Sequence, residues 1–324
     1  MRLLIPGGAG YIGSHMVRYA QDAGHEVVVL DDLSSGNQWA VNDCELINIS
    51  LLDKEGLKRE MNGRFFDGVI HFAAKSIVPE SMINPLLYYR NNVEGSFNLI
   101  EALLENDINN IVFSSTAAIF GNPLEKKISE DHPKNPINPY GKSKLMVENF
   151  LKDIYETKKI NSTCLRYFNA AGAHESGEIG ECHDPETHLI PVILKSVLDP
   201  NLVLKVFGDD YNTHDGTCIR DYIHVYDLCN AHLLSIENMM KAEGCYFYNL
   251  GNGNGFSVKE VIKSCEKVTK SNINFEVIDK RFGDPDMLVS NSMRASKELN
   301  WHPKYDNLDE IIASAWKWHR KELS

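Results

Sequence analysis

Residues Gly7-Gly8-Ala9-Gly10-Tyr11-Ile12-Gly13 form a glycine-rich turn between the apolar run Leu3-Leu4-Ile5 and a predicted helix over 14–23. Glycine at positions 7, 10 and 13 permits a tight turn, a close approach of the backbone to a ligand and close packing of the helix on the sheet. The first N–H groups of the helix would point at an anion. Strand, turn and helix in this order predict a site for a dinucleotide pyrophosphate.

Asp31 ends the next apolar run, eighteen positions after Gly13. A carboxylate at this point accepts hydrogen bonds from the ribose hydroxyls of adenosine and repels a 2′-phosphate. The sequence therefore predicts NAD, rather than NADP, as the cofactor. The competing interpretation is an ordinary glycine-rich turn, and the presence of strand, helix and acid together weighs against it.

Composition limits the class of protein. The chain has 324 residues, 43% hydrophobic and 24% charged, which suits a globular protein with a large core. A formal net charge of −12 argues against an extended nucleic-acid surface. We find no signal peptide and no apolar segment long enough to span a membrane. Seven scattered cysteines without C-x-x-C spacing fit a reducing compartment, so we predict a cytoplasmic protein.

Short apolar runs alternate with amphipathic helical patterns in the first half of the chain. The runs lie at 3–5, 27–30, 69–72, 111–113 and 163–167. This rhythm predicts an α/β fold, a doubly wound parallel sheet of Rossmann type, with a smaller C-terminal substrate lobe. We predict an NAD-binding domain over 1–172 and a second domain over 173–324. The segment 219–250 is a candidate to return to the first domain, so the boundary is interleaved.

Tyr140 and Lys144 have the spacing Y-x-x-x-K in a helix predicted to begin just after Pro139. Side chains at i and i+4 share a helix face. A phenol is a poor base near neutral pH, and a nearby cation favours its phenolate form. The predicted strand 111–113 is followed by two serines and then by Thr116. At this end of the strand, Thr116 can share a proton with a substrate hydroxyl. Alone, this helix pair is more typical of a solvated face, but the glycine turn upstream favours alcohol oxidation.

Several motifs together resemble the extended short-chain dehydrogenase/reductases and, more narrowly, the UDP-glucose (UDP-galactose) 4-epimerases. They are the glycine turn, Phe113-Ser114-Ser115-Thr116, the Tyr140/Lys144 pair, Arg166-Tyr167-Phe168-Asn169, and Arg220-Asp221-Tyr222-Ile223-His224-Val225. The resemblance runs almost end to end. It implies an NAD-dependent isomerase of galactose metabolism, acting on a UDP-sugar as a homodimer.

The resemblance also implies roles for individual residues. Tyr140 would be the base, Lys144 its electrostatic partner and a ligand of the nicotinamide ribose, and Thr116 the hydroxyl beside the reacting oxygen. The cofactor would contact Gly7, Gly10, Tyr11, Ile12, Gly13, Asp31, Phe72, Asn91, Ser114, Lys144 and Tyr167. The UDP-sugar would contact Asn169, His188, Leu189, Phe207, Arg220, Arg281, Asp284 and Leu288. A guanidinium fork suits a diphosphate, which makes the two arginines chemically reasonable.

The sequence departs from that family at four positions. Ser76 replaces a lysine beside the cofactor, and Ser50 replaces an acid near the adenine. His188 replaces an asparagine near the sugar, and Leu288 replaces a tyrosine lining the sugar pocket. These changes bear on substrate range rather than reaction class. We therefore predict turnover of UDP-glucose and UDP-galactose, with the N-acetylhexosamines as further candidate substrates.

Two other functions compete with epimerisation. A 4,6-dehydratase needs further acid/base groups, typically just after the threonine, and Thr116 is followed by Ala117 and Ala118. A catalytically silent NAD-binding module would not need both Tyr140 and Lys144.

A metal site is a separate question, because Cys182, His183 and His188 crowd one loop. Their spacing matches no standard zinc pattern, and a loop that covers a substrate explains the polar residues equally well. We therefore predict no metal.

Overall fold

The computed structural model describes residues 1–158, 160–199, 201–281 and 284–322. These residues divide into two compact units. The first unit comprises 1–121, 133–166 and 229–248, and the second comprises 122–132, 167–228 and 249–324. The chain passes to the second unit after Arg166, with 122–132 also in that unit, and it returns to the first unit over 229–248, within the segment 219–250 offered for such a return.

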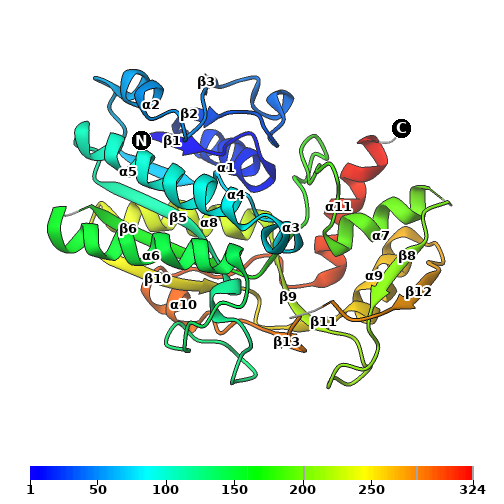
Figure 1. The fold of residues 1–324 in the computed structure, drawn as a ribbon. Helices are drawn as coiled ribbons and strands as arrows, with labels where there is room; N and C mark the ends of the chain where they lie inside the picture. Colours follow the sequence, from blue (N-terminus) through cyan, green and yellow to red (C-terminus); the bar gives the residue numbers. More distant parts are fainter. Residues whose placement is uncertain (159, 200, 282–283, 323–324) are drawn as a thin grey trace. The chain divides into compact units, whose positions relative to one another are not determined.

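A seven-stranded sheet forms the centre of the first unit, in the order β10-β6-β5-β4-β1-β2-β3 (Figure 1). Its strands are β1 (Arg2–Pro6), β2 (Glu26–Asp31), β3 (Glu45–Asn48), β4 (Gly68–His71), β5 (Asn110–Thr116), β6 (Asn161–Tyr167) and β10 (Cys245–Leu250). Strand β1 pairs in parallel with β2 and β4, β2 with β3, and β4 with β5. The order reverses at β1, as in a doubly wound dinucleotide-binding sheet. The predicted fold class is therefore confirmed.

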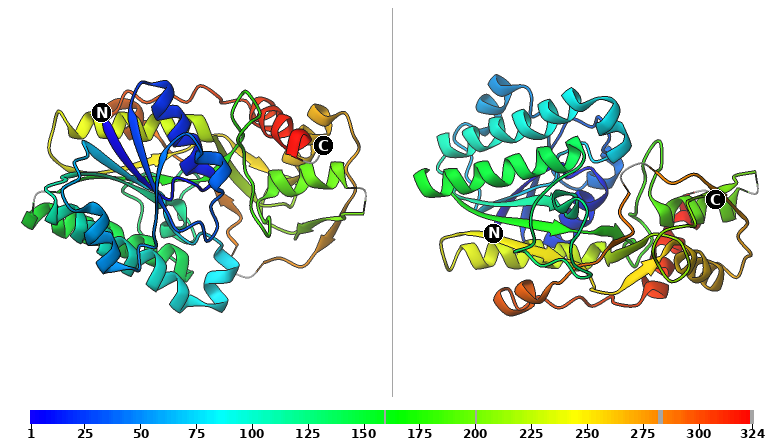
Figure 2. Two further views of the ribbon diagram at one scale, coloured as in Figure 1. Left: turned by 90° about the horizontal axis from the view of Figure 1, so that it is seen from above. Right: turned by 60° about the horizontal axis from the view of Figure 1, so that its bottom comes forward.

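Helices cover both faces of this sheet, which is why its strands are apolar on both sides. Figure 2 shows α2 (Lys54–Met61), α5 (Gly95–Glu105) and α6 (Pro139–Lys158) on one face, and α1 (Tyr11–Asp22) and α8 (Val225–Met239) on the other. Shorter elements join them: η1 (Gln38–Val41), α3 (Val78–Ile83), α4 (Pro85–Tyr88), the π-helix η2 (Tyr89–Glu94) and η3 (Ala117–Phe120). The core between α2, α5, α6 and the sheet includes Leu4, Val69, Leu99, Phe113 and Leu151, each almost fully buried.

The second unit contains two small sheets. In the larger sheet, β9 (Ile219–His224) pairs with β7 (Asn169–Ala171), β11 (Gly255–Ser257) and β13 (Met287–Leu288). The smaller sheet pairs β8 (Leu204–Phe207) with β12 (Phe275–Ile278). Helices α7 (Leu189–Leu198), α9 (Val258–Thr269) and α11 (Leu308–Glu322) pack together around a second apolar core, and α10 (Met293–Glu298) is a short further helix.

Local sequence signals account for several helix boundaries. Ser257 and Glu260 form a capping box at the start of α9, where each side chain bonds to the backbone N–H of the other residue. Asp53 caps α2 by accepting from the Gly56 N–H. Across the described ranges, no helix is both long enough and apolar enough to cross a membrane.

Candidate active site

The turn after β1 has two glycines that its own backbone requires. Gly7 has a φ of +79°, and a Cβ there would come within 2.3 Å of the Ala73 nitrogen. A Cβ on Gly13 would come within 2.1 Å of the Gly7 carbonyl oxygen. Because contacts this short are impossible, a side chain at either position would push the turn, α1 and the end of β4 apart. Packing therefore explains why positions 7 and 13 are glycine, as the sequence pattern predicted.

Gly10 is different, since nothing in the fold demands a glycine there. Its φ of −78° is open to any residue, and a Cβ would find only the Gly7 oxygen, at 3.5 Å. As the N-cap of α1, Gly10 marks the start of the helix, where N–H groups are directed at an approaching anion. A bare backbone at this point leaves room for a phosphate. The turn therefore fits the pyrophosphate of a dinucleotide.

Asp31 is buried at the end of β2 and is tied to the glycine turn. Its Oδ2 accepts from the Ala9 N–H at 3.0 Å, and its Oδ1 accepts from the Leu33 N–H at 2.9 Å. Burial raises the pKa of Asp31, while these two backbone bonds oppose the rise. A carboxylate has about four acceptor positions, so both oxygens can still accept from ribose hydroxyls. Asp31 thus shapes the turn in addition to any contact with a ligand.

The other predicted cofactor residues of the first unit lie at the ends of neighbouring elements. The Phe72 N–H, just after β4, donates to the Pro6 carbonyl at 2.8 Å, which holds this chain segment beside the glycine turn. Asn91 lies in η2 and donates to Asn92 Oδ1 at 3.1 Å. Ser114 lies in β5. Such carboxyl-end positions are where parallel sheets bind ligands.

Tyr140 and Lys144 lie one turn apart near the start of α6, and Thr116 is the last residue of β5. Burial raises the pKa of Tyr140, and its hydrogen bond with Thr116 offsets part of that rise. The Tyr88 ring meets the Tyr140 ring edge-on, with centroids 6.4 Å apart. Thr116 thus lies near enough to Tyr140 to act on the pKa of its phenol, which brings together two of the three predicted catalytic groups.

Lys144 is buried and held in a fixed position. Its Nζ donates to the Ser114 carbonyl at 2.8 Å and lies 4.8 Å from the centre of the Phe113 ring. Burial lowers the pKa of Lys144 to about 7. A lysine with this pKa exchanges its charge near neutral pH, which is typical of functional sites and costly in a purely structural role.

A buried ion pair that the sequence analysis did not predict lies beneath these residues. Arg166 at the end of β6 bonds Glu148 of α6 through two nitrogens, at 2.9 and 2.7 Å. Ser115 of β5 donates to the same carboxylate at 2.5 Å. Glu148 lies one turn beyond Lys144, so the pair fastens the catalytic part of α6 to two strands. Arg166 appeared in the sequence only as part of a motif, without a role.

Asn92 is a second unpredicted residue that fixes the site. It is buried in the π-helix η2, a type of helix that often occurs at functional sites. Its side chain bonds both the N–H and the carbonyl of Lys75, at 2.8 and 3.0 Å, and donates to Ser143 Oγ at 3.1 Å. Ser143 precedes Lys144. The amide therefore joins the segment after β4 to the catalytic helix.

The second unit gathers three predicted substrate residues on one small sheet. Leu288 of β13 lies in register with Arg220 of β9, and Asn169 of β7 lies in register with Tyr222. Because positions i and i+2 of a strand share a face, Asn169, Arg220 and Leu288 lie on the same face. Tyr167, a predicted cofactor residue, is two positions before Asn169 and ends β6.

Two further pairs complete this cluster. Arg220 forms an ion pair with Asp284, and its other nitrogen donates to the Ile219 carbonyl at 2.8 Å. The guanidinium of Arg281 stacks on the Phe207 ring, 3.8 Å from its centre. A cation stacked on an aromatic ring and a buried cation beside it suit a nucleotide diphosphate. Four predicted substrate residues thus form two contacting pairs, Arg220 with Asp284 and Arg281 with Phe207. A fifth, Leu288, lies beside Arg220 on the neighbouring strand.

Asp221, the residue after Arg220, has an internal task. Its carboxylate accepts from the N–H groups of Asn252, Gly253 and Ser290, at 2.9, 3.0 and 2.9 Å. It thereby links β9 to the loops before β11 and after β13, and burial raises its pKa to about 6. Asp221 therefore has a structural task, whereas its neighbour Arg220 pairs with Asp284.

His188 is the N-cap of α7 and Leu189 is its first residue. Among the described residues, no hydrogen bond or ion pair joins either of them to Arg220. His188 Nδ1 instead lies 2.8 Å from Glu181 Oε1 and 3.1 Å from Glu186 Oε1. Burial lowers the pKa of His188, but the two carboxylates outweigh it and raise the pKa to about 10. His183 joins the same group, and its pKa rises to about 9 for the same reason.

Comparison with known proteins identifies the family to which the chain belongs. Residues 3–251 match the family described as the NAD dependent epimerase/dehydratase family. The chain belongs to that family. The resemblance read from the motifs is therefore confirmed.

Relatives within the NAD dependent epimerase/dehydratase family are similar along their whole length. A UDP-glucose 4-epimerase of Halalkalibacterium halodurans is 46% identical over 99% of this chain and 96% of its own. The crystal structure of UDP-glucose 4-epimerase from Brucella ovis in complex with NAD is 42% identical, with a TM-score of 0.94 over 97% of both chains. The UDP-Glc/GlcNAc 4-epimerase of Campylobacter jejuni is 41% identical, with a TM-score of 0.87 over 99% of both chains.

Proposed function

We propose that this chain is a UDP-glucose 4-epimerase that interconverts UDP-glucose and UDP-galactose with bound NAD. The observation that carries the proposal is the placement of Thr116 near the Tyr140 phenol, with Lys144 buried one turn along the same helix as Tyr140. Full-length similarity to UDP-glucose 4-epimerases supports the same conclusion. Bound NAD would supply a reversible acceptor for the hydride at C4 of the sugar, which allows the hydride to return to the opposite face.

The residues of the first unit would manage the proton. Tyr140 would accept the proton of the C4 hydroxyl, and Thr116, which lies near the same phenol, would donate to the reacting oxygen. Lys144 would stabilise the phenolate electrostatically, since a positive charge nearby favours the ionised form. Glu148 and Asn92 would keep Lys144 in place through the helix that carries it. Proton transfer by a positioned side chain contributes typically about 10²–10⁴-fold to a rate.

The cofactor-binding residues would be the glycine turn, with Asp31 selecting NAD over NADP. The open space beyond Gly10 supports a pyrophosphate there, and the matching family is described as NAD dependent. Cofactor released from the purified protein and identified by mass spectrometry should be NAD(H). A preparation that carries mainly NADP(H) would contradict the role of Asp31.

The residues of the second unit would bind the UDP-sugar. Arg220 and Arg281 would contact the diphosphate, Phe207 would line the uracil pocket, and Asn169 would lie near the sugar. Asp284 pairs with Arg220, so it would orient that guanidinium for the ligand. Arginine forks match phosphate oxygens in geometry as well as charge.

Leu288 bears on the range of sugars. The resemblance places it against the C2 substituent, where leucine is shorter than tyrosine. The similarity to the Campylobacter jejuni UDP-Glc/GlcNAc 4-epimerase is compatible with a wider range. We infer that UDP-GlcNAc and UDP-GalNAc are additional substrates.

A single experiment tests the assigned reaction. The purified protein is incubated separately with UDP-galactose and with UDP-GalNAc, and the products are separated by chromatography. We expect UDP-glucose from the first and UDP-GlcNAc from the second, without added cofactor. A 4-keto-6-deoxy product would instead indicate a 4,6-dehydratase, which the alanines after Thr116 already disfavour. Absence of any product would favour a silent NAD-binding module.

The resemblance implies an assembly, and the cysteine pattern favours a location. We propose a homodimer, as the resemblance to the epimerases implies, and a cytoplasmic location, which cysteines without disulfides suit. Light scattering at several protein concentrations would measure the assembly. A monomer at every concentration would contradict it.

A further inference from the structure

The loop before α7 gathers four side chains that are metal ligands by type. Glu181, His183, Glu186 and His188 each offer one oxygen or nitrogen, and these four atoms all lie within 4.8 Å of one another. The side chains of both glutamates are only 5% exposed. Buried carboxylates are costly unless they are paired or coordinate a metal. We refer to these four residues as the Glu-His cluster.

The nitrogen-to-oxygen distances in the cluster lie near those between neighbouring ligands of a tetrahedral ion. His183 Nδ1 lies 3.3 Å from Glu181 Oε1 and 3.5 Å from Glu186 Oε2. His188 Nδ1 lies 2.8 Å from Glu181 Oε1 and 3.1 Å from Glu186 Oε1. Zinc bonds to nitrogen and oxygen of roughly 2.0–2.1 Å place neighbouring tetrahedral ligands about 3.3 Å apart. An ion would need only small movements of these side chains.

One buried oxygen supplies a second, independent observation. Within the part of the chain that the structure describes, Glu186 Oε2 makes no hydrogen bond, although it is shielded from solvent. It lies 3.5 Å from His183 Nδ1, so it faces the inside of the cluster. The ion pair with His183 is too long for a good hydrogen bond, so the oxygen remains open to a further partner. A bound cation at the centre of the cluster provides one.

We propose that the Glu-His cluster binds one divalent transition-metal ion, with Zn²⁺ the best match. Two imidazoles and two carboxylates form a nitrogen and oxygen set that suits zinc and related ions better than Mg²⁺ or Ca²⁺, which prefer oxygen alone. A divalent ion would replace the protons that the two carboxylates hold on the imidazoles, and two neutral imidazoles with two carboxylates would then give a neutral site. This assignment departs from the sequence prediction of no metal, which considered Cys182 and omitted both glutamates.

The position of the cluster gives the ion a structural role. His188 is the N-cap of α7 and Leu189 is its first residue. An ion held by 181, 183, 186 and 188 would close this loop and fix the direction in which α7 begins. Because the resemblance places Leu189 against the substrate, the ion would also hold that backbone in position. The metal proposal itself does not depend on the identity of the sugar.

The first test measures metal directly. The chain is produced without a polyhistidine tag, stripped with a chelator, dialysed and titrated with Zn²⁺. We expect one tightly bound ion per chain by mass spectrometry of the elements, and a higher melting temperature with Zn²⁺ than without it. Co²⁺ in place of Zn²⁺ should show the visible absorption of a tetrahedral site. Absence of a bound ion and of a melting shift in the unmodified chain would overturn the proposal.

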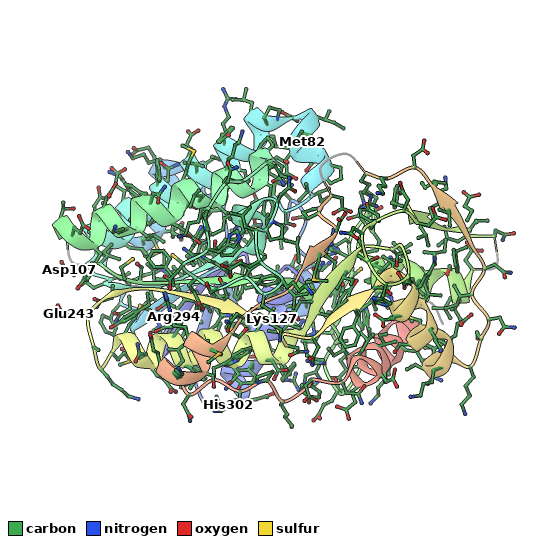
Figure 3. All side chains as sticks on the ribbon, turned by 90° about the horizontal axis from the view of Figure 1, so that it is seen from below. Met82, Asp107, Lys127, Glu243, Arg294 and His302 are labelled. Carbon is green, nitrogen blue, oxygen red and sulfur yellow. The ribbon has the colours of Figure 1, made fainter. Side chains whose placement is uncertain are left out.

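Variants then locate the ion. Glu186→Gln and His183→Gln should each weaken Zn²⁺ binding by on the order of tenfold or more, since ligands and their supports carry the affinity. The matched control is His302→Gln, an exposed histidine in the same unit, labelled in Figure 3, which should bind zinc like the parent. Cys182→Ala should also retain the ion. Loss of zinc in either control, or unchanged binding in both cluster variants, would contradict the assigned ligands.

Discussion

Glu148 and Arg166 form a buried ion pair with two parallel bonds, Nε to Oε1 at 2.9 Å and Nη2 to Oε2 at 2.7 Å. The side chains are 1% and 2% exposed. The guanidinium lies between two aromatic rings, 5.7 Å from the Phe120 centroid and 4.7 Å from that of Phe247. The pair satisfies the charges of both residues and connects α6 to β6.

Removing one charge from this pair should damage both stability and activity. Glu148→Gln leaves the Arg166 cation buried without a counter-ion, a change that typically costs about 3–5 kcal/mol. We expect a clearly lower melting temperature, and a fall in kcat because Lys144 lies on the same helix. Glu156→Gln, an exposed position on α6, is the matched control. A parental melting temperature for Glu148→Gln would show that the pair does not fasten the helix.

The role of Tyr140 as the base can be tested by removing only its hydroxyl group. Tyr140→Phe keeps the ring that packs against Tyr88 but removes the group that accepts the proton. We expect a loss of at least about 10²-fold in kcat for UDP-galactose, with the content of bound cofactor unchanged. Tyr155→Phe, on the same helix, should remain active. Turnover close to the parent in Tyr140→Phe would remove this tyrosine from the mechanism.

Burial of Lys144 predicts a dependence of stability on pH. Its folded pKa of about 7 lies below the ordinary 10.5. Between these values the unfolded chain binds more protons, so this group favours the folded state increasingly as pH rises from 7 toward 10, and that contribution is lost as pH falls to 7. In cofactor-free protein, Lys144→Met should therefore raise the melting temperature most at pH 6–7.

The same variant separates stability from function. The advantage of Lys144→Met should shrink as the pH approaches 10, and its turnover should be lost at every pH because no cation remains beside Tyr140. Differential scanning calorimetry at several pH values measures the first effect. A lower melting temperature for Lys144→Met at pH 6 would contradict the unfavourable burial of the lysine.

The two kinds of glycine in the phosphate turn should respond differently to alanine. A Cβ on Gly10 meets only one protein atom, at 3.5 Å, whereas a Cβ on Gly13 would overlap the Gly7 oxygen. Gly10→Ala should therefore fold with a melting temperature near the parent, after cofactor removal, but bind NAD more weakly. Gly13→Ala should lose stability as well. Equal NAD affinity in Gly10→Ala and the parent would show that the pyrophosphate does not lie there.

Local signals explain which parts of the site the sequence could predict. The glycine turn, Asp31 and the Tyr140/Lys144 spacing each lie within one strand, turn or helix, so their geometry follows from a short stretch of chain. The class of sheet, doubly wound and parallel, followed from the alternation of strands and helices. These features needed no knowledge of distant contacts.

Long-range pairing explains what the sequence could not predict. Glu148 accepts from Ser115, which is 33 positions away, and Arg220 pairs with Asp284, which is 64 positions away. No local pattern marks such partners. The sequence offers 219–250 as a candidate return to the first domain, but the bounds of that return, 229–248, depend on β10 lying next to β6 at the edge of the first sheet. The Glu-His cluster could have been predicted from the sequence, since its four members lie within eight residues. The sequence prediction considers its two histidines but not its two glutamates.

The range of sugars should depend on the volume at Leu288. This residue lies in register with Arg220 on the sheet that carries the predicted substrate groups, and the resemblance places it against the C2 substituent. Leu288→Tyr adds a ring where an acetamido group would need room, and overlap discriminates more strongly than one lost apolar contact. We expect kcat/KM for UDP-GalNAc to fall by on the order of 10-fold or more relative to that for UDP-galactose. Leu288→Ile, of equal volume, is the control and should keep the parental ratio. Equal losses on both substrates, or no N-acetylhexosamine turnover in the parent, would show that Leu288 does not set the range.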